Sequence, residues 1–306
     1  MSPIQTTFGM KEGQSPLKFK LFGIGGAGCN LVAGTSFLSV AIGSSQKEVD
    51  KCRNSQKIIL SPETLESFAS TDISVLTPNM MPKEVTDAFF DHDISVLIAG
   101  LGGETGSGGI RCFASASKVM SKPSISVVSL PFSVESFNRR EMAASTLIDL
   151  KKRSDLVISF ANDKLKKLVP NLPIDKVFKV MNAIMERPVT DLSRIMIQTD
   201  LPMMKQISSG SDEFRLGVGL GRGISRDLIA IKEAIDSPWF DFDLSSVESA
   251  FLVISSYPID SKEVDVVIKA VHSKIFDAKL MFGSYEDPSL GDRLRVTLLA
   301  GKPNSI

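Results

Sequence analysis

The sequence predicts an α/β protein. Its parts are a Rossmann-like, doubly wound parallel sheet, a connecting central helix and a smaller α+β domain with a four-stranded sheet. Three observations favour this fold class. Short apolar runs alternate with helical stretches in the first half of the chain, as in parallel sheets with helices on both faces. Two glycine-rich segments stand between a strand and a helix. In the last third, strands and helices follow in an order that fits an α+β unit.

Strands and helices of the large sheet are read from apolar runs and amphipathic stretches. The predicted strands are 19–24, 57–60, 94–99, 125–130 and 156–160, and the predicted helices or helical turns are 30–36, 62–70, 82–90, 110–120 and 138–152.

The run from Leu101 to Gly109 has five glycines in nine residues, which is too dense for an ordinary turn. It follows the strand 94–99 and precedes the helix 110–120. Glycines let a backbone approach a ligand closely, and the free amides and dipole of a helix start favour an anion. The segment therefore predicts a phosphate-binding loop, with a flexible connection as the alternative.

A second glycine loop, 23–28, has the spacing of a dinucleotide fingerprint. That fingerprint also needs an acidic residue about twenty positions later, at a strand end. Asp50 is near that distance but lies in a polar run, which argues against a nicotinamide cofactor. We expect both glycine loops, 131–140 and Asn162 at the carboxyl ends of strands, where ligands bind such sheets.

The remaining elements belong to the connecting helix and the smaller domain. A helix from Asp175 to about Leu192 is expected to be interrupted or to end near Pro188. The strands predicted after it are 215–220, 250–256, 279–285 and 294–300, and the helices are 225–235 and 261–276.

Composition excludes several functions. Lysine plus arginine and aspartate plus glutamate number 35 each, so neither nucleic acid nor a membrane surface is indicated as a partner. No apolar run is long enough for a membrane span and no signal-peptide pattern is seen, so we expect a cytoplasmic protein. Cys29, Cys52 and Cys112 lack paired spacing, which indicates reduced thiols. His92 and His272 lack metal-ligand spacing and are expected at the surface, so no metal site is predicted.

Several motifs, in order along the chain, resemble those of the tubulin/FtsZ family. Gly102–Gly108, GGETGSG, resembles the signature loop GGGTGSG, and Gly25–Asn30 resembles the family's first glycine loop. Pro131-Phe132 with Glu135 and Arg140, Asn162–Leu165, 217–223 and 234–238 resemble further family segments. The likeness covers about residues 18–302. The chain is identified as a divergent FtsZ-like member, closer to archaeal FtsZ than to eukaryotic tubulin.

The resemblance implies five parts of the chain. They are a flexible arm (1–16), a nucleotide-binding domain (17–172), a connecting helix with a catalytic-type loop (173–200), an α+β domain (201–302) and a tail (303–306).

The resemblance also implies a bound guanine nucleotide, GTP or GDP, with Mg²⁺ as a candidate companion ion. Phe178 would stack on guanine, and Asn182, one helical turn later, would hydrogen-bond it. The plain alternatives are a core aromatic for Phe178, a solvated residue for Asn182 and a helix cap for Glu135. The implied binding residues are Gly25, Gly26, Ala27, Gly28, Cys29, Asn30 (base), Gly102, Gly103, Glu104, Thr105, Gly106, Ser107, Gly108, Pro131, Glu135 (ribose), Arg140 (phosphates or base), Asn162 (ribose or base), Phe178 and Asn182.

The catalytic loop departs from the family pattern. In the family a loop Asn-x-Asp-Phe-x-Asp of the next subunit polarises the attacking water. Here Gln198 replaces the asparagine and Met203 stands at the second aspartate, while Asp200 is retained. Asp200 is the candidate catalytic residue in trans and Gln198 a weaker candidate, so turnover should be slow or absent. A helix cap is the alternative for Asp200.

The terminal-phosphate end departs as well. Leu76–Pro82, with two prolines, replaces a glycine- and alanine-rich loop, and Ser45 stands where an aspartate is expected. Glu104 occupies a loop position that is normally glycine, and a carboxylate there repels phosphate unless a cation lies between them.

The favoured function is a guanine-nucleotide-binding cytoskeletal protein that associates head to tail, with weak GTPase activity and a role in cell division or cell shape. The first alternative is a catalytically silent FtsZ-like regulatory or structural module. The second is a nicotinamide-dependent oxidoreductase. A membrane adaptor and the cellular process are left open.

Overall fold

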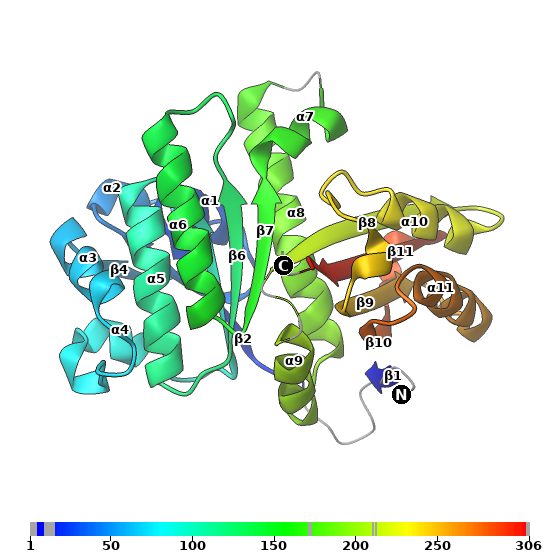
Figure 1. Cartoon of the computed structure of the whole chain (residues 1–306), viewed down its shortest axis with the longest axis horizontal. Coiled ribbons are helices and arrows are strands. Elements are labelled where there is room, and N and C mark those ends of the chain that lie inside the picture. Colours follow the sequence, from blue (N-terminus) through cyan, green and yellow to red (C-terminus); the bar gives the residue numbers. More distant parts are fainter. Residues whose placement is uncertain (1–4, 9–15, 171–172, 210, 212, 304–306) are drawn as a thin grey trace. The chain divides into compact units, whose positions relative to one another are not determined.

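The computed structural model describes residues 5–8, 16–170, 173–209, 211 and 213–303. The chain divides into two compact units (Figure 1). The first unit comprises residues 17–186, and the second comprises residues 1–16 and 187–306. Each unit has its own strands and its own hydrophobic core.

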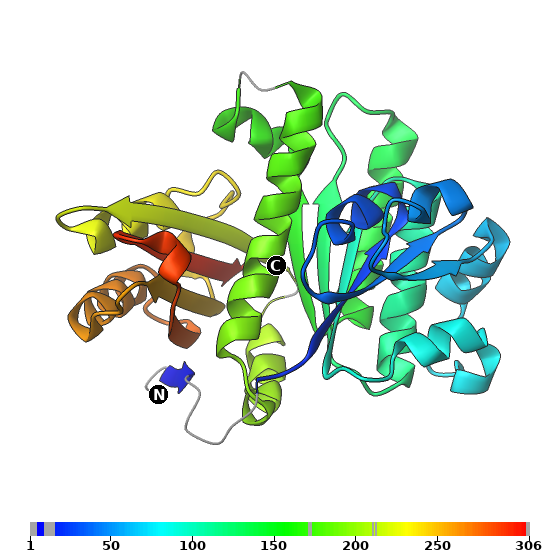
Figure 2. The same cartoon turned by 180° about the vertical axis from the view of Figure 1, so that it is seen from behind.

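The first unit is built on a parallel sheet with the strand order β7-β6-β5-β2-β3-β4. In Figure 1 α5 and α6 lie in front of this sheet, and Figure 2 shows α1 on the opposite face. The doubly wound fold is therefore confirmed. The strands are β2 (Phe19–Ile24), β3 (Leu38–Gly43), β4 (Gln56–Ile59), β5 (Ile94–Gly100), β6 (Ser124–Leu130) and β7 (Leu156–Ala161). The helices are α1 (Gly25–Val32), α2 (Gln46–Val49), α3 (Pro62–Ser70), α4 (Lys83–Ala88), α5 (Glu104–Val119), α6 (Phe137–Arg153) and α7 (Leu165–Leu168), with short 3-10 turns at Pro78–Met80 and Asn162–Lys164.

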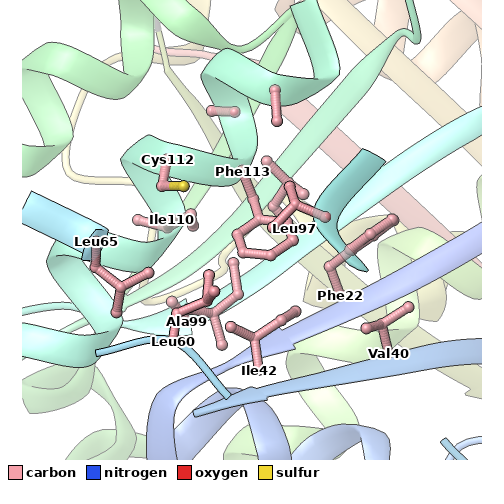
Figure 3. Close-up of a cluster of buried hydrophobic side chains, with 14 of the residues drawn as sticks. Phe22, Val40, Ile42, Leu60, Leu65, Leu97, Ala99, Ile110, Cys112 and Phe113 are labelled. Atoms are coloured by element: carbon pink, nitrogen blue, oxygen red, sulfur yellow. The ribbon is translucent and has the colours of Figure 1, made fainter. Parts of the chain in front are cut away.

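Central strands are buried on both faces, which explains their continuous apolar runs. Phe22 and Leu97 of the sheet pack against Phe113 of α5 (Figure 3). The ring of Phe22 lies 5.9 Å from that of Phe113 between centroids. His92 belongs to this region and is only 3% exposed, so the prediction that it lies at the surface is wrong. Its Nε2 lies 2.8 Å from the Ser95 hydroxyl, a contact that sequence spacing does not reveal.

Both glycine-loop helices begin earlier than predicted. Helix α5 begins at Glu104, not at residue 110, and α1 begins at Gly25, not at residue 30. The glycines inside them serve close packing, because a Cβ on Gly106 would lie 2.3 Å from the carbonyl oxygen of Gly100. A Cβ on Gly28 would lie 2.2 Å from the Ile98 oxygen. Glycine weakens a helix in general, but here it lets the helix approach the strand.

Helix α8 (Ile174–Ile195) continues through Pro188, so the predicted break there is wrong. Proline removes one hydrogen bond and normally ends or kinks a helix. Met185, Val189 and Leu192 are buried beside it at helical spacing. Their packing offsets the lost hydrogen bond, and the helix runs on.

The second unit has the strand order β1-β10-β9-β11-β8. β1, β10 and β9 are parallel, whereas β11 is antiparallel to β9 and β8. The four predicted strands are present, and β1 (Gln5–Phe8) adds a fifth from the segment expected to be an arm; four residues are too short for a pattern to reveal. The other elements are β8 (Phe214–Arg222), β9 (Ser249–Ser256), β10 (Lys279–Glu286), β11 (Arg293–Gly301), α9 (Leu201–Ser208), α10 (Arg226–Ile235) and α11 (Ser261–Lys274), with 3-10 turns at Gln198–Asp200, Leu244–Ser246 and Pro288–Leu290.

Glycines on β8 determine how α10 packs. A Cβ on Gly219 would lie 1.8 Å from the Ala230 oxygen, and one on Gly221 would lie 1.7 Å from the Arg226 oxygen. The pattern 217–223 in the sequence thus reflects backbone contact between a strand and a helix. Among the described residues, no helix is long and apolar enough to cross a membrane.

Candidate functional site

A cavity of ≈ 300 Å³ lies at the carboxyl ends of the parallel strands in the first unit. Its walls include residues of the α1 start that comes after β2, residues that directly follow β5 and β7, and the end of β6. This edge is where open parallel sheets bind ligands. Nine of the predicted binding residues line the cavity: Gly26, Ala27, Gly103, Glu104, Thr105, Gly106, Asn162, Phe178 and Asn182.

The start of α5 forms a polar part of the wall. Gly103 is the N-cap residue, and having no side chain it offers no capping hydrogen bond to the first amides of the helix. Glu104, Thr105 and Gly106 are the first residues of α5 and all line the cavity. Free amides and the positive end of the dipole of a sixteen-residue helix therefore face this region. An anion, such as phosphate, is the group that this end can hold.

The two glycine loops contact each other. Gly25, at the start of α1, has a φ of +66°, and a Cβ there would lie 3.1 Å from the amide nitrogen of Gly106. A left-handed glycine thus lets the chain turn directly from β2 into α1 beside α5. Gly26 and Ala27 follow it in the cavity wall.

Some residues of the first loop serve the core. The Cys29 thiol donates weak hydrogen bonds to the oxygens of Gly23 and Ile42, at 3.4 and 3.5 Å, and burial raises the pKa of Cys29 to about 12. Asn30 is exposed and does not line the cavity; its Oδ1 accepts a hydrogen bond from Lys51. Gly28 is likewise a packing residue.

Helix α8 contributes mainly apolar side chains to the cavity wall. Phe178, Met181, Asn182 and Met185 line the cavity at positions that share one helical face. Phe178 is 47% exposed, so it is not a core aromatic. Its ring meets that of Phe132 edge-on, at 6.5 Å between centroids and 74°. A half-exposed ring beside an amide is suited to the flat face and polar edge of a base.

In the segment 131–140, the residue that lines the cavity is not one of those predicted. Arg139 lines it, whereas Pro131, Glu135 and Arg140 do not. Glu135 accepts a hydrogen bond from the Phe132 amide at 2.7 Å and pairs with Arg139 at 3.2 Å. Glu135 therefore closes the turn before α6, and its predicted ribose contact, like that of Arg140 with phosphate or base, stays a prediction.

The rest of the signature loop is structural in this conformation. Gly102 has a φ of +94°, and its amide donates a hydrogen bond to the Ser107 hydroxyl at 2.9 Å. Ser107 and Gly108 are buried. Gly108 borders a second cavity of ≈ 290 Å³ with Leu65 and Arg111.

Sequence reasoning missed seven residues of the wall. Met181 and Met185 could have been found, because they follow Phe178 at helical spacing. Glu48 lies in the polar run that contains Asp50, and nothing local in the sequence marks it as a wall residue. Arg139 directly precedes Arg140, the residue that the family motif indicates. The missed residues are Glu48, Gly100, Leu101, Ser129, Arg139, Met181 and Met185.

Asp200 belongs to the second unit. Its Oδ2 accepts a hydrogen bond from the Ile197 amide at 2.8 Å, so it caps the turn before α9. Burial raises the pKa of Asp200. The side chain of Gln198 lies outside the described part of the chain, and a catalytic role for either residue stays a prediction.

Two family models match the chain. That of the tubulin/FtsZ family GTPase domain matches residues 18–170, and that of the FtsZ family C-terminal domain matches residues 214–302. The chain belongs to the tubulin/FtsZ family. The predicted resemblance is therefore confirmed, and the family's GTPase domain implies guanine-nucleotide binding and a cytoskeletal role at family level.

Relatives and solved structures agree with this family. "Cell division protein FtsZ 1" of Thermococcus kodakarensis is 29% identical over 301 residues, which cover 94% of this chain and 81% of that protein. "Mitochondrial division protein fszA" of Dictyostelium discoideum is 28% identical and covers 90% of this chain and 57% of that protein. The solved "FtsZ dimer, empty" of M. jannaschii superimposes with a TM-score of 0.81 at 25% identity and covers 94% and 89% of the two chains. A GTPγS-bound protofilament of CetZ2 from Haloferax volcanii has a TM-score of 0.75 at 20% identity over 94% of each chain, which is a likeness of fold.

Proposed function

We propose that the first unit binds a guanine nucleotide, GTP or GDP, in the cavity at the carboxyl edge of its sheet. The observation that carries this proposal is one cavity wall made of the α1 start, the α5 start and the Phe178–Asn182 face of α8. A helix start suits phosphates and a half-exposed ring suits a purine, so the two ends of the cavity match the two ends of a nucleotide. Its volume of ≈ 300 Å³ is at the lower end of small-molecule sites.

Individual roles follow from position. The amides of Gly103–Gly106 hold phosphate oxygens, and Arg139 adds a positive charge to the wall. Phe178 stacks on the base, while Asn182 and Asn162 hydrogen-bond the base or the ribose. Glu104 is exposed at the phosphate end, and its hard carboxylate oxygens are the kind of ligand that Mg²⁺ takes beside phosphate.

The most direct test is nucleotide identity and affinity. Purified full-length protein, denatured and analysed by chromatography, should release guanine nucleotide, and titration with GDP should saturate at one per chain. ATP and NAD serve as competitors that should not displace it. Failure of both guanine nucleotides to bind would sink the proposal.

Hydrolysis and assembly form the second part of the proposal. Subunits associate head to tail, so that Asp200 of one copy acts on the nucleotide of the next, as in the family pattern. Membership of a family with dimer and protofilament structures supports association. Turnover is weak, because Met203 supplies no second carboxylate and the segment around Pro78–Met80 carries bulky side chains in place of glycines.

A silent module is the competing candidate, and one contact favours it. The Asp200 carboxylate already accepts a hydrogen bond from Ile197 and acts as a local cap. Phosphate release measured over a range of protein concentrations separates the two functions. Release that rises with concentration and falls in Asp200→Ala supports a GTPase; no release at any concentration supports the silent module.

The cellular role is proposed from the relatives. Names of relatives refer to cell division and mitochondrial division. We infer a cytoplasmic protein that acts in division or in cell shape, with no nucleic-acid partner. Fluorescent tagging in the source cells, with localisation to a division site or elsewhere, decides between these processes.

A further inference from the structure

The Glu48 carboxylate accepts hydrogen bonds from Ser44, at the end of β3. Its Oε2 accepts from the Ser44 amide at 2.7 Å and from the Ser44 hydroxyl at 3.2 Å. Ser44 directly follows β3, at the sheet edge where the cavity opens. A carboxylate oxygen and a phosphate oxygen compete for the same donors, because both are anionic acceptors. The protein thus holds an anion of its own at a position that could receive a phosphate oxygen.

Two contacts locate this carboxylate at the phosphate end of the cavity. The Ser44 hydroxyl lies 2.9 Å from that of Thr105, in the first turn of α5. Glu48 and Thr105 both line the cavity. Glu48 therefore neighbours the helix start that is suited to an anion.

Gly43 makes room for this arrangement. A Cβ at residue 43 would lie 2.9 Å from both the Cβ and the Oε2 of Glu48. Such a distance is too short for a stable contact, so a larger residue would push the Glu48 side chain aside. The inward position of Glu48 depends on a glycine five residues earlier.

The described lining residues carry more carboxylates than basic side chains. Glu48 and Glu104 line the cavity, and Arg139 is the one basic side chain among the described lining residues. Arg139 is also paired with Glu135 at 3.2 Å. A triphosphate adds about one negative charge relative to a diphosphate, and that charge meets these carboxylates.

We propose that Glu48 determines which nucleotide the cavity prefers, favouring GDP over GTP. To hydrogen-bond Ser44, the third phosphate would have to displace the Glu48 carboxylate from the Ser44 amide and hydroxyl. It would also come close to the negative charge of that carboxylate. This inference rests on the proposed guanine-nucleotide binding and extends it to the number of phosphates.

Equilibrium titration of full-length protein with GDP and with GTPγS, without divalent cations, tests the inference. Wild-type protein should bind GDP more tightly. Glu48→Gln keeps an acceptor for Ser44 but removes the charge, so it should improve GTPγS affinity about tenfold and leave GDP affinity within about twofold. Glu84→Gln, which neutralises an exposed carboxylate on α4 outside the cavity wall, should leave the ratio unchanged.

Two results would overturn the inference: tighter wild-type binding of GTPγS than of GDP, or an unchanged ratio in Glu48→Gln. The wild-type ratio needs no variant, so the inference remains testable even if Glu48→Gln fails to fold. If wild-type protein binds neither GDP nor GTPγS, the proposed function itself is wrong, and so is the inference that rests on it.

Discussion

The hydroxyl groups of Ser44 and Thr105 lie 2.9 Å apart, so a hydrogen bond joins the end of β3 to the first turn of α5. The two residues are far apart in sequence, but both stand at the carboxyl edge of the parallel sheet. The contact fixes one wall of the cavity before a ligand arrives. Such preorganisation lowers the entropy that binding must overcome.

Removing the Thr105 hydroxyl should therefore weaken both folding and binding. For Thr105→Val we expect a loss of about 1 kcal/mol in the free energy of unfolding, because the Ser44 hydroxyl loses a partner. GDP affinity should fall several-fold. Urea unfolding and GDP titration measure the two effects. Thr105→Ser keeps the hydroxyl and is the matched control; if it behaves like Thr105→Val, the hydrogen bond is not the cause.

Phe178 should contribute to nucleotide affinity far more than to stability. Its ring is 47% exposed on the cavity face of α8, so Phe178→Ala should lower the free energy of unfolding by less than about 1 kcal/mol. Loss of stacking should weaken GDP binding by about 1–3 kcal/mol. Phe137→Ala removes a 67% exposed ring on α6, outside the cavity wall, and should leave GDP affinity unchanged. Equal effects of the two variants would contradict stacking by Phe178.

Much of the fold follows from sequence, because buried parallel strands are continuous apolar runs and motifs occur in a fixed order. β2 matches its predicted range, and the sheet of the first unit is parallel as predicted, but β3 (Leu38–Gly43) was not predicted. Helix starts at Gly25 and Glu104 were missed, since glycine-rich segments are assigned to loops by propensity. What made them helical is tertiary packing against Gly100 and Ile98, which no local pattern encodes.

The candidate site was predictable in its backbone and less so in its side chains. Glycine loops and the Phe178–Asn182 spacing located the cavity walls. Glu48 was not predicted as a wall residue, because its position depends on the local fold that brings its carboxylate to the Ser44 amide. Likewise, whether Arg139 or Arg140 lines the cavity depends on which way each side chain points in the first turn of α6. A motif that is shifted by one residue does not determine this direction.

His92 should make stability depend on pH. Burial lowers its pKa to about 4 in the folded protein, against about 6.5 in the unfolded chain. Between these values the unfolded chain binds the extra proton, so the free energy of unfolding falls as pH drops from about 7 to about 4. His92→Gln should reduce this fall, because a glutamine side chain does not titrate. Urea unfolding at several pH values measures it, and an equal fall in wild type and His92→Gln would refute the assignment.

Asp191 organises a buried polar network in the second unit. It is 1% exposed and accepts hydrogen bonds from the Thr297 hydroxyl at 2.6 Å and the Tyr285 hydroxyl at 2.8 Å. Arg295 lies 3.4 Å from the same carboxylate. Burial is the main cause that raises the pKa of Tyr285 to about 12, with the Asp191 charge adding to it. The network joins α8 to β10 and β11, so its loss affects the packing of the whole unit.

Asp191→Ala should destabilise the protein by about 3–5 kcal/mol, because it leaves the Arg295 charge with fewer partners in a buried site. The matched control is Asp292→Ala, which breaks an exposed ion pair with Arg222 at 2.8 Å and should lower the free energy of unfolding far less, because solvent screens the pair. Chemical unfolding of the full chain measures both. If both variants lower the free energy of unfolding by similar amounts, burial does not strengthen the interactions of Asp191. A buried ion pair would then stabilise the protein no more than an exposed one.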